Sequence, residues 1–156
     1  MLIRLLAAGT RLPGWVGEGY AEYAARMGPE VRLELVEIPV TPRGRNADIP
    51  RARAEEGRRM LAALDPRMHV TALDVKGRAM TTEQLSRWLA ARLADGRDVA
   101  LLIGGPDGID PACMERAEAA WSLSPLTFPH GLVRVMVAEQ LYRAQSILKG
   151  HPYHRA

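Results

Sequence analysis

Apolar and polar residues along this chain follow two kinds of pattern. Short apolar or alternating runs predict five strands, which cover residues 2–8, 31–35, 68–73, 99–103 and 121–123. Apolar residues spaced three and four apart predict helices over residues 13–27, 50–64, 81–95, 111–120 and 132–148. Strands and helices therefore alternate from end to end. This order is typical of an α/β fold with a mostly parallel sheet flanked by helices, and we expect one domain over residues 1–156.

Three local signals refine this outline. Residues 41–48 are polar and show no periodicity, which predicts a loop. Lys76 and Gly77 are turn formers after the third predicted strand, so we expect a turn there. Thr81 and Gln84 have the spacing of a capping box, which predicts the start of the next helix.

The fourth predicted strand ends abruptly in glycines. Residues 99–103 are all apolar, and Gly104, Gly105 and Gly108 follow closely. Because glycine lacks a side chain, a ligand can lie against its peptide groups, and cofactor loops are built in this way. A tight turn from strand to helix without a ligand is the alternative. The segment lacks the Gly-Lys-Ser/Thr of a phosphate-binding loop and the glycine spacing of a dinucleotide-binding fold.

Ligands of parallel α/β sheets gather where strands end at their carboxyl side. In this chain those places follow Leu73, Ile103 and Leu123. The last of them lies in residues 122–130, where small hydroxyl side chains are mixed with prolines. We expect an ordered loop whose free peptide groups can read the edge of a base. An ordinary surface loop is the alternative.

Side chains suited to chemistry occur near the end of the chain. His130 opens the last helix and Arg134 follows one turn later, on the same edge; a capping histidine with a solvated arginine is the alternative. Residues 151–155 contain two histidines, a tyrosine and an arginine, which can move a proton, stack on a base and hold phosphate. A disordered polar tail is the alternative. The two histidines lack a third partner at a spacing that suits a metal.

Composition sets broad limits on the protein class. The net charge of +3 is compatible with a polyanionic partner, and the lone Cys113 excludes an internal disulfide. The apolar start is short and lacks the positive flank of a secretory signal, and no apolar run approaches the length of a membrane span, so we expect a cytoplasmic protein. The first half of the helix 132–148 is apolar nearly all round, which favours burial in a homodimer interface.

Taken together, several segments resemble one known family. They are residues 8–10, 46–49, 101–108, 122–130, 132–135, 139–144 and 151–155. In this order they are similar to the RlmH family, small bacterial methyltransferases of the SPOUT class that modify large-subunit ribosomal RNA. Asp107 stands where relatives often have glutamate, and Gly131 stands where relatives vary.

This resemblance implies a SPOUT methyltransferase fold with a C-terminal trefoil knot, which ordinary topology rules do not predict. It also implies a homodimer that acts on the ribosome, without a metal or a membrane. The implied substrate is a pseudouridine of 23S rRNA, methylated at N3 in the assembled ribosome. The implied cofactor is S-adenosylmethionine, held by Leu73, Gly104, Leu123, Ser124, Pro125, Leu126, Thr127 and Phe128.

The residue types suggest roles in an in-line methyl transfer, in which the protein positions N3 and excludes water. His130 or His154 is the candidate acceptor for the N3 proton. Arg134 and an arginine of the tail would neutralise phosphate or the developing anion, and the tail tyrosine would pack on the base. The tail residues expected to bind substrate are His151, Tyr153 and Arg155.

Because a small chain offers little surface, we expect the tail of one subunit to complete the site of the other. Two other functions stay open on the sequence. One is a SPOUT methyltransferase that acts on transfer RNA, and the other is a non-catalytic ribosome-binding factor in which the glycine loop is merely structural.

Overall fold

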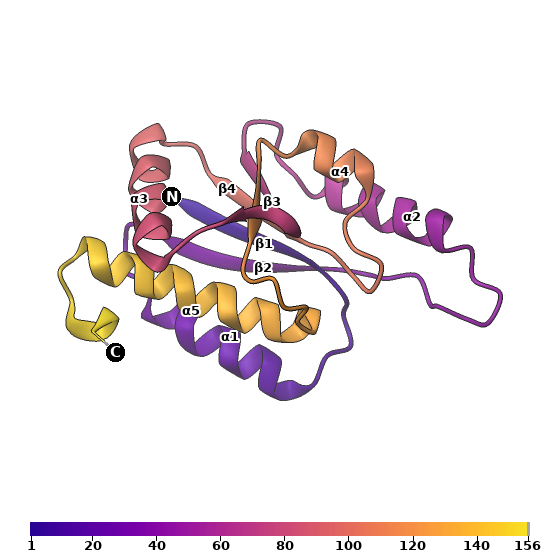
Figure 1. Cartoon of the computed structure of the whole chain (residues 1–156), viewed down its shortest axis with the longest axis horizontal. Helices are drawn as coiled ribbons and strands as arrows, with labels where there is room; N and C mark the ends of the chain where they lie inside the picture. The colour runs from indigo at the N-terminus through magenta and orange to yellow at the C-terminus, as the bar shows by residue number, and fades with distance from the viewer. Residues whose placement is uncertain (156) are drawn as a thin grey trace.

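A parallel sheet of five strands forms the centre of the protein (Figure 1). The computed structural model describes residues 1–155, and the strand order is β2-β1-β4-β3-β5. The strands are β1 (Leu2–Ala8), β2 (Arg32–Ile38), β3 (His69–Ala79), β4 (Val99–Ile103) and β5 (Ala119–Ser122). Every neighbouring pair runs parallel, so all carboxyl ends lie at one edge of the sheet. The predicted α/β fold with a parallel sheet is confirmed.

Helices cover both faces of this sheet (Figure 1). One face carries α1 (Gly14–Arg26), α3 (Thr82–Asp95) and α5 (His130–Leu148). The other carries α2 (Ile49–Ala62) and α4 (Pro111–Arg116). Successive strand residues point to opposite faces, so Leu5 of β1 enters the first core while Leu6 enters the second. Sheets buried on both sides need apolar strands without alternation, which is the pattern of β1 and β4.

The helices begin where the sequence signals predict. Thr81 Oγ1 accepts a hydrogen bond from the Gln84 N–H at 3.2 Å, and Gln84 Oε1 accepts one from the Thr81 N–H at 2.9 Å. The capping box is therefore confirmed. Asp48 caps α2 by accepting from the Arg51 N–H at 3.1 Å. No helix within residues 1–155 is both long and apolar enough to cross a membrane.

The third strand does not end at Leu73, and this prediction is wrong. β3 continues to Ala79, and Leu73 and Arg78 both pair with Trp121 of β5. The turn signal at Lys76 and Gly77 marks a bulge inside the strand instead. A Cβ on Gly77 would lie 2.7 Å from the Trp121 backbone N, so only glycine lets β5 approach the bulge this closely.

Boundaries of other elements also differ from the sequence prediction. α4 ends at Arg116 rather than near Ala120, because the Glu118 N–H already donates to the Val70 carbonyl of β3 at 2.8 Å. β2 runs to Ile38 rather than to residue 35, because it pairs with β1 along the whole length of that strand. β5 covers Ala119–Ser122 rather than residues 121–123, because its first two residues already pair with β3. In each case long-range strand pairing overrides the local pattern.

Candidate functional site

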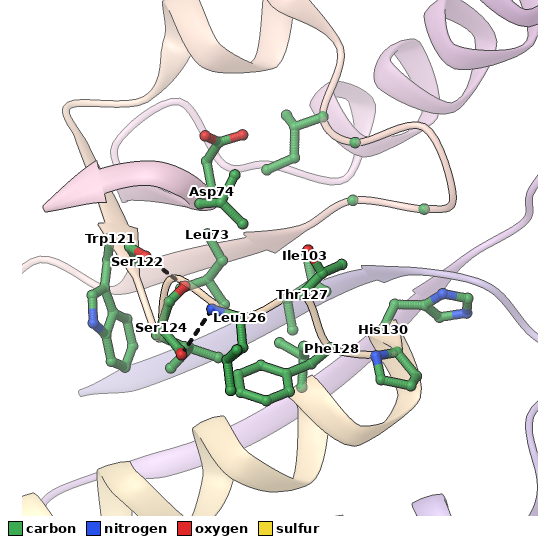
Figure 2. Close-up of a pocket in the computed structure, with 18 of the residues that line it drawn as sticks. Leu73, Asp74, Ile103, Trp121, Ser122, Ser124, Leu126, Thr127, Phe128 and His130 are labelled. Atoms are coloured by element: carbon green, nitrogen blue, oxygen red, sulfur yellow. Dashed lines mark hydrogen bonds between the residues drawn. The ribbon is translucent and has the colours of Figure 1, made fainter. Parts of the chain in front are cut away.

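A cavity of about 380 Å³ lies where β3, β4 and β5 reach the carboxyl edge of the sheet (Figure 2). Its walls come from the segments that follow Leu73, Ile103 and Trp121. Small-molecule sites in proteins span roughly 300–1,000 Å³, so the cavity has the size of a ligand site. The three places at which a ligand was expected, after Leu73, Ile103 and Leu123, therefore meet around one cavity, although β3 continues past Leu73.

The bulge of β3 supplies one wall. Asp74 and Val75 lie in the bulge and line the cavity beside Leu73. The Lys76 N–H donates to Asp74 Oδ1 at 2.8 Å, which fixes the bend of the chain here. The bulge thus brings an acidic side chain to the cavity, next to apolar ones.

The glycine segment after β4 supplies a second wall. The Gly108 N–H donates to the Gly105 carbonyl at 3.1 Å, and Gly108 has a φ of +82°, in the left-handed region. A Cβ on Gly104 would lie 2.6 Å from the carbonyl carbon of Gly108. Two of the glycines are therefore needed to close the turn, and their lack of side chains also leaves the turn's peptide groups accessible from the cavity.

The loop after β5 supplies the third wall. Ser124 Oγ accepts from the Leu126 N–H at 3.0 Å, and Ser122 Oγ donates to the Ser124 carbonyl at 3.2 Å (Figure 2). These bonds order the loop. Residues 123–129 are neither helix nor strand, so their peptide groups are not committed to a ladder and can bind a ligand. The loop residues in the lining are Leu123, Ser124, Leu126, Thr127 and Phe128; Pro125 is outside it.

His130, the first residue of α5, lies at one side of the cavity (Figure 2). Burial, together with the nearby positive charge of Arg134, holds the pKa of its imidazole below the ordinary value. The imidazole is therefore neutral at pH 7 and able to accept a proton.

Arg134 does not line the cavity. Its side chain is 1% exposed, and Nη1 donates to Glu37 Oε2 at 2.8 Å. Nη2 donates to the carbonyls of Ala8 and Gly9 at 3.1 and 2.7 Å. The expectation that this guanidinium neutralises phosphate or a developing anion does not fit this position, because its charge is already paired inside the protein. It instead fixes the start of α5 to the end of β1.

The tail follows the last turn of α5 and folds back on this helix (Figure 1), whereas His130 of the cavity wall is the first residue of the helix. Residues Pro152–His154 form a single 3-10 turn rather than an irregular tail. Tyr153 Oη donates to Glu139 Oε1 at 3.1 Å, and Arg143 lies 4.8 Å from the centre of the tyrosine ring. Within residues 1–155, no three histidine, cysteine, aspartate or glutamate side chains gather in a way that would hold a metal ion.

A single chain therefore brings together only part of the predicted site. Helix α5 has 19 residues, and a helix of this length spans about 28 Å. His130 lies at its first residue, whereas the tail packs near its last turns. The tail residues set apart from the cavity in this way are His151, Tyr153, His154 and Arg155.

Sequence reasoning missed several residues of the cavity wall. The missed residues include Asp74, Ile109, Trp121 and Val133. Asp74 had a usable signal, because it directly follows Leu73, and so had Trp121, because it lies in the predicted strand 121–123. Ile109 and Val133 had none, because they reach the cavity only through the packing of the turn and of α5.

Comparison with known proteins agrees with this geometry. A family model described as "Predicted SPOUT methyltransferase" matches residues 1–154. The chain therefore belongs to the SPOUT methyltransferase family.

Its relatives carry one more specific name. A protein of Alkalilimnicola ehrlichii named "Ribosomal RNA large subunit methyltransferase H" is 63% identical over 156 residues, which is 100% of both chains. A protein of the same name from Thioalkalivibrio sulfidiphilus is 56% identical over 99% of both chains. This confirms the resemblance to the RlmH family.

Solved structures show the same fold at low sequence identity. A putative methylase family protein from Neisseria gonorrhoeae has a TM-score of 0.53 at 16% identity, covering 90% of this chain and 81% of the other. A probable rRNA-methyltransferase from Porphyromonas gingivalis has a TM-score of 0.52 at 14% identity, covering 94% and 68%.

The position of Arg134 predicts a structural role for its guanidinium. Arg134→Met should lower the free energy of unfolding by about 3 kcal/mol, because the buried Ala8 and Gly9 carbonyls lose their donor. Urea unfolding at fixed protein concentration measures this. Arg51→Met, at a side chain that is 78% exposed, is the matched control and should change it by less than about 0.5 kcal/mol. Equal stability of the two variants would contradict the assignment.

Proposed function

We propose that this chain transfers a methyl group from S-adenosylmethionine to N3 of a pseudouridine in 23S rRNA of the assembled ribosome. The observation that carries the proposal is the cavity beside the β3 bulge and the ends of β4 and β5, in a chain 63% identical over its full length to a protein named as a large-subunit ribosomal RNA methyltransferase. Since ribosomes are cytoplasmic, the proposal also places the protein there. The trefoil knot expected from the resemblance is part of the same proposal.

The cavity fits S-adenosylmethionine in size and in the chemistry of its walls. Leu73, Ile103, Leu126 and Phe128 offer apolar surface to a flat base. The peptide groups of the loop 123–129 can pair with the edge of that base, and Asp74 places a negative charge near a cationic ligand. When bound, S-adenosylmethionine supplies a methyl group on a positively charged sulfur, which is already activated for transfer.

The chain's own residues then have to hold the target base and take up the N3 proton. The neutral imidazole of His130 lies at the cavity and can accept this proton. His154 is the second candidate. Its Nδ1 lies 2.6 Å from the His151 carbonyl, which can only accept, so Nδ1 carries a hydrogen and Nε2 is the ring nitrogen that this contact leaves free.

The tail of a second copy supplies the remaining contacts. Tyr153 would pack on the base, and Arg155, with His151, would neutralise phosphate or the developing anion. The tail cannot do this in its own chain, because α5 separates it from the cavity. The first half of α5 also carries Leu132, Val135 and Met136, which its own chain covers only in part. A homodimer through this helix would bury them and bring the partner's tail to the cavity.

Methyl transfer to different RNAs tests the function. With radiolabelled S-adenosylmethionine, we expect transfer to intact ribosomes that lack the modification and none to free transfer RNA. Leu126→Asp, at an exposed position of the cavity wall, should abolish transfer without unfolding the protein. Ile49→Asp is the matched control, because Ile49 is also an exposed aliphatic residue but lies outside the cavity lining. This variant should leave methyl transfer intact.

Two results would contradict the proposal. Transfer to transfer RNA but not to ribosomes would favour a transfer-RNA methyltransferase of the same class. A chain that binds ribosomes but shows no heat of binding to S-adenosylmethionine would be a non-catalytic ribosome-binding factor.

Mixed dimers test whether the tail acts on the partner's cavity. One subunit is truncated after Gly150 and the other carries Leu126→Asp, so that each homodimer is inactive. In the mixed dimer the intact cavity meets the intact tail of the partner, and about half of the wild-type single-turnover rate should return. No recovery would mean that tail and cavity must belong to one chain. His154→Ala is then added to the subunit that carries Leu126→Asp, whose tail meets the intact cavity. An unchanged rate would exclude His154 as the group that takes up the N3 proton.

A further inference from the structure

A partly buried ion network holds the glycine turn from its outer side. The turn faces the cavity through Gly104, Gly105 and Gly108. The side chain of Asp107 is not part of the cavity wall, and its Oδ2 accepts a hydrogen bond from Arg43 Nε at 2.7 Å. The cavity wall is thus fixed by a contact made outside the cavity.

The same guanidinium is anchored to helix α2. Arg43 Nη1 and Nη2 donate to the two carboxylate oxygens of Glu56 at 2.7 and 3.3 Å. Nη1 also donates to the Thr41 carbonyl at 2.6 Å, and the Thr41 N–H donates to Glu56 at 3.2 Å. Arg43 therefore bridges a helix and the turn with a planar fork, the geometry in which arginine is most specific.

Burial separates this pair from the other ion pairs of α2. The Glu56 side chain is 5% exposed and that of Arg43 is 19% exposed. Arg51 and Arg58, which pair with Glu55 of the same helix, are 78% and 74% exposed. Exposed pairs of that kind contribute little.

A buried ion pair is not explained by stability alone. Removing two charges from water offsets much of their attraction, and an apolar pair of similar volume is often as stable. The charged pair also fixes the orientation of the Arg43 side chain. One edge of the guanidinium binds Glu56, which leaves Nε to donate to Asp107. The bond between the Gly108 N–H and the Gly105 carbonyl closes the turn on itself, and Asp107 is the residue of the turn whose side chain is tied to Arg43 in the loop before α2.

We propose that Arg43 is a positioning residue, which holds the glycine turn in its cofactor-binding form through Asp107 while Glu56 fixes the guanidinium. This inference rests on the proposed function, because it takes the ligand of the turn to be S-adenosylmethionine or its product. Residues 41–48, a loop without regular structure before α2, thereby become part of the cofactor site without touching the cavity.

Asp107 variants test the link, because they leave the pair of Arg43 and Glu56 in place. Calorimetry with S-adenosylhomocysteine, the product form of the cofactor, is the measurement. Asp107→Ala should weaken binding by about tenfold, the loss of roughly one charge-assisted hydrogen bond. Asp107→Glu keeps the carboxylate and should stay within about threefold of wild type.

Two readouts separate positioning from general stability. Without ligand, the melting temperature of Asp107→Ala should equal that of wild type, while amide hydrogen exchange in residues 104–109 speeds up and exchange in β4 does not. Asp65→Ala removes another aspartate–arginine pair, the more exposed one with Arg67, which lies outside the cavity wall, and it should leave both affinity and exchange unchanged.

The outcomes are distinct. Equal affinity of wild type and Asp107→Ala, or equal weakening by Asp65→Ala, overturns the inference while leaving the proposed function intact. Weakening by Asp107→Glu as large as that by Asp107→Ala also overturns it. A wild-type chain that does not bind S-adenosylhomocysteine contradicts the proposed function itself, and this inference with it.

Discussion

Parallel pairing of β3, β4 and β5 is the constraint on which the rest of the structure depends. Three segments far apart in the sequence become neighbours only because their strands share one direction and one register. The approach of β5 to β3 in turn needs Gly77, where any side chain would meet the backbone of Trp121. The cavity is thus a consequence of strand pairing. Its walls are mostly segments that leave the sheet, so their peptide groups have no partners in the ladder.

Two arginines fix segments around the cavity to the rest of the fold. Arg134, fully buried, ties the first turn of α5 to the end of β1 and so sets where His130 stands. Arg43, in the loop before α2, ties the glycine turn to that helix through Asp107 and Glu56. Both arginines act on the cavity without lining it. In each case the fork geometry of the guanidinium fixes one segment against another, which a lysine could not do.

The sequence predicted the elements and the general place of the cavity, because both follow from local patterns. Apolar runs, caps and glycines are short-range signals, and the rule that ligands lie at carboxyl ends of parallel strands needs only the order of elements. The bulge in β3 was not predictable in this way, because it depends on the approach of β5. The burial of Arg134 was missed for a similar reason. Helical spacing shows which residues share one edge of a helix, but it does not show whether that edge is buried in the fold.

The cavity and the tail, the two parts of the candidate site, are therefore built in different ways. The cavity is built by one chain, from backbone segments fixed by the sheet. The titratable and aromatic side chains of the tail are docked on the far part of α5 by Glu139 and Arg143. Such a division suits an enzyme whose cofactor site is preformed and whose substrate site is assembled from two copies.

A crystal structure with bound S-adenosylhomocysteine tests the central claim most directly. The account predicts that its adenosine lies in the cavity between Leu73, Gly104 and the loop 123–128, with hydrogen bonds to peptide groups of that loop. A cavity that stays empty at saturating ligand, or a ligand bound at another surface of the protein, would contradict it.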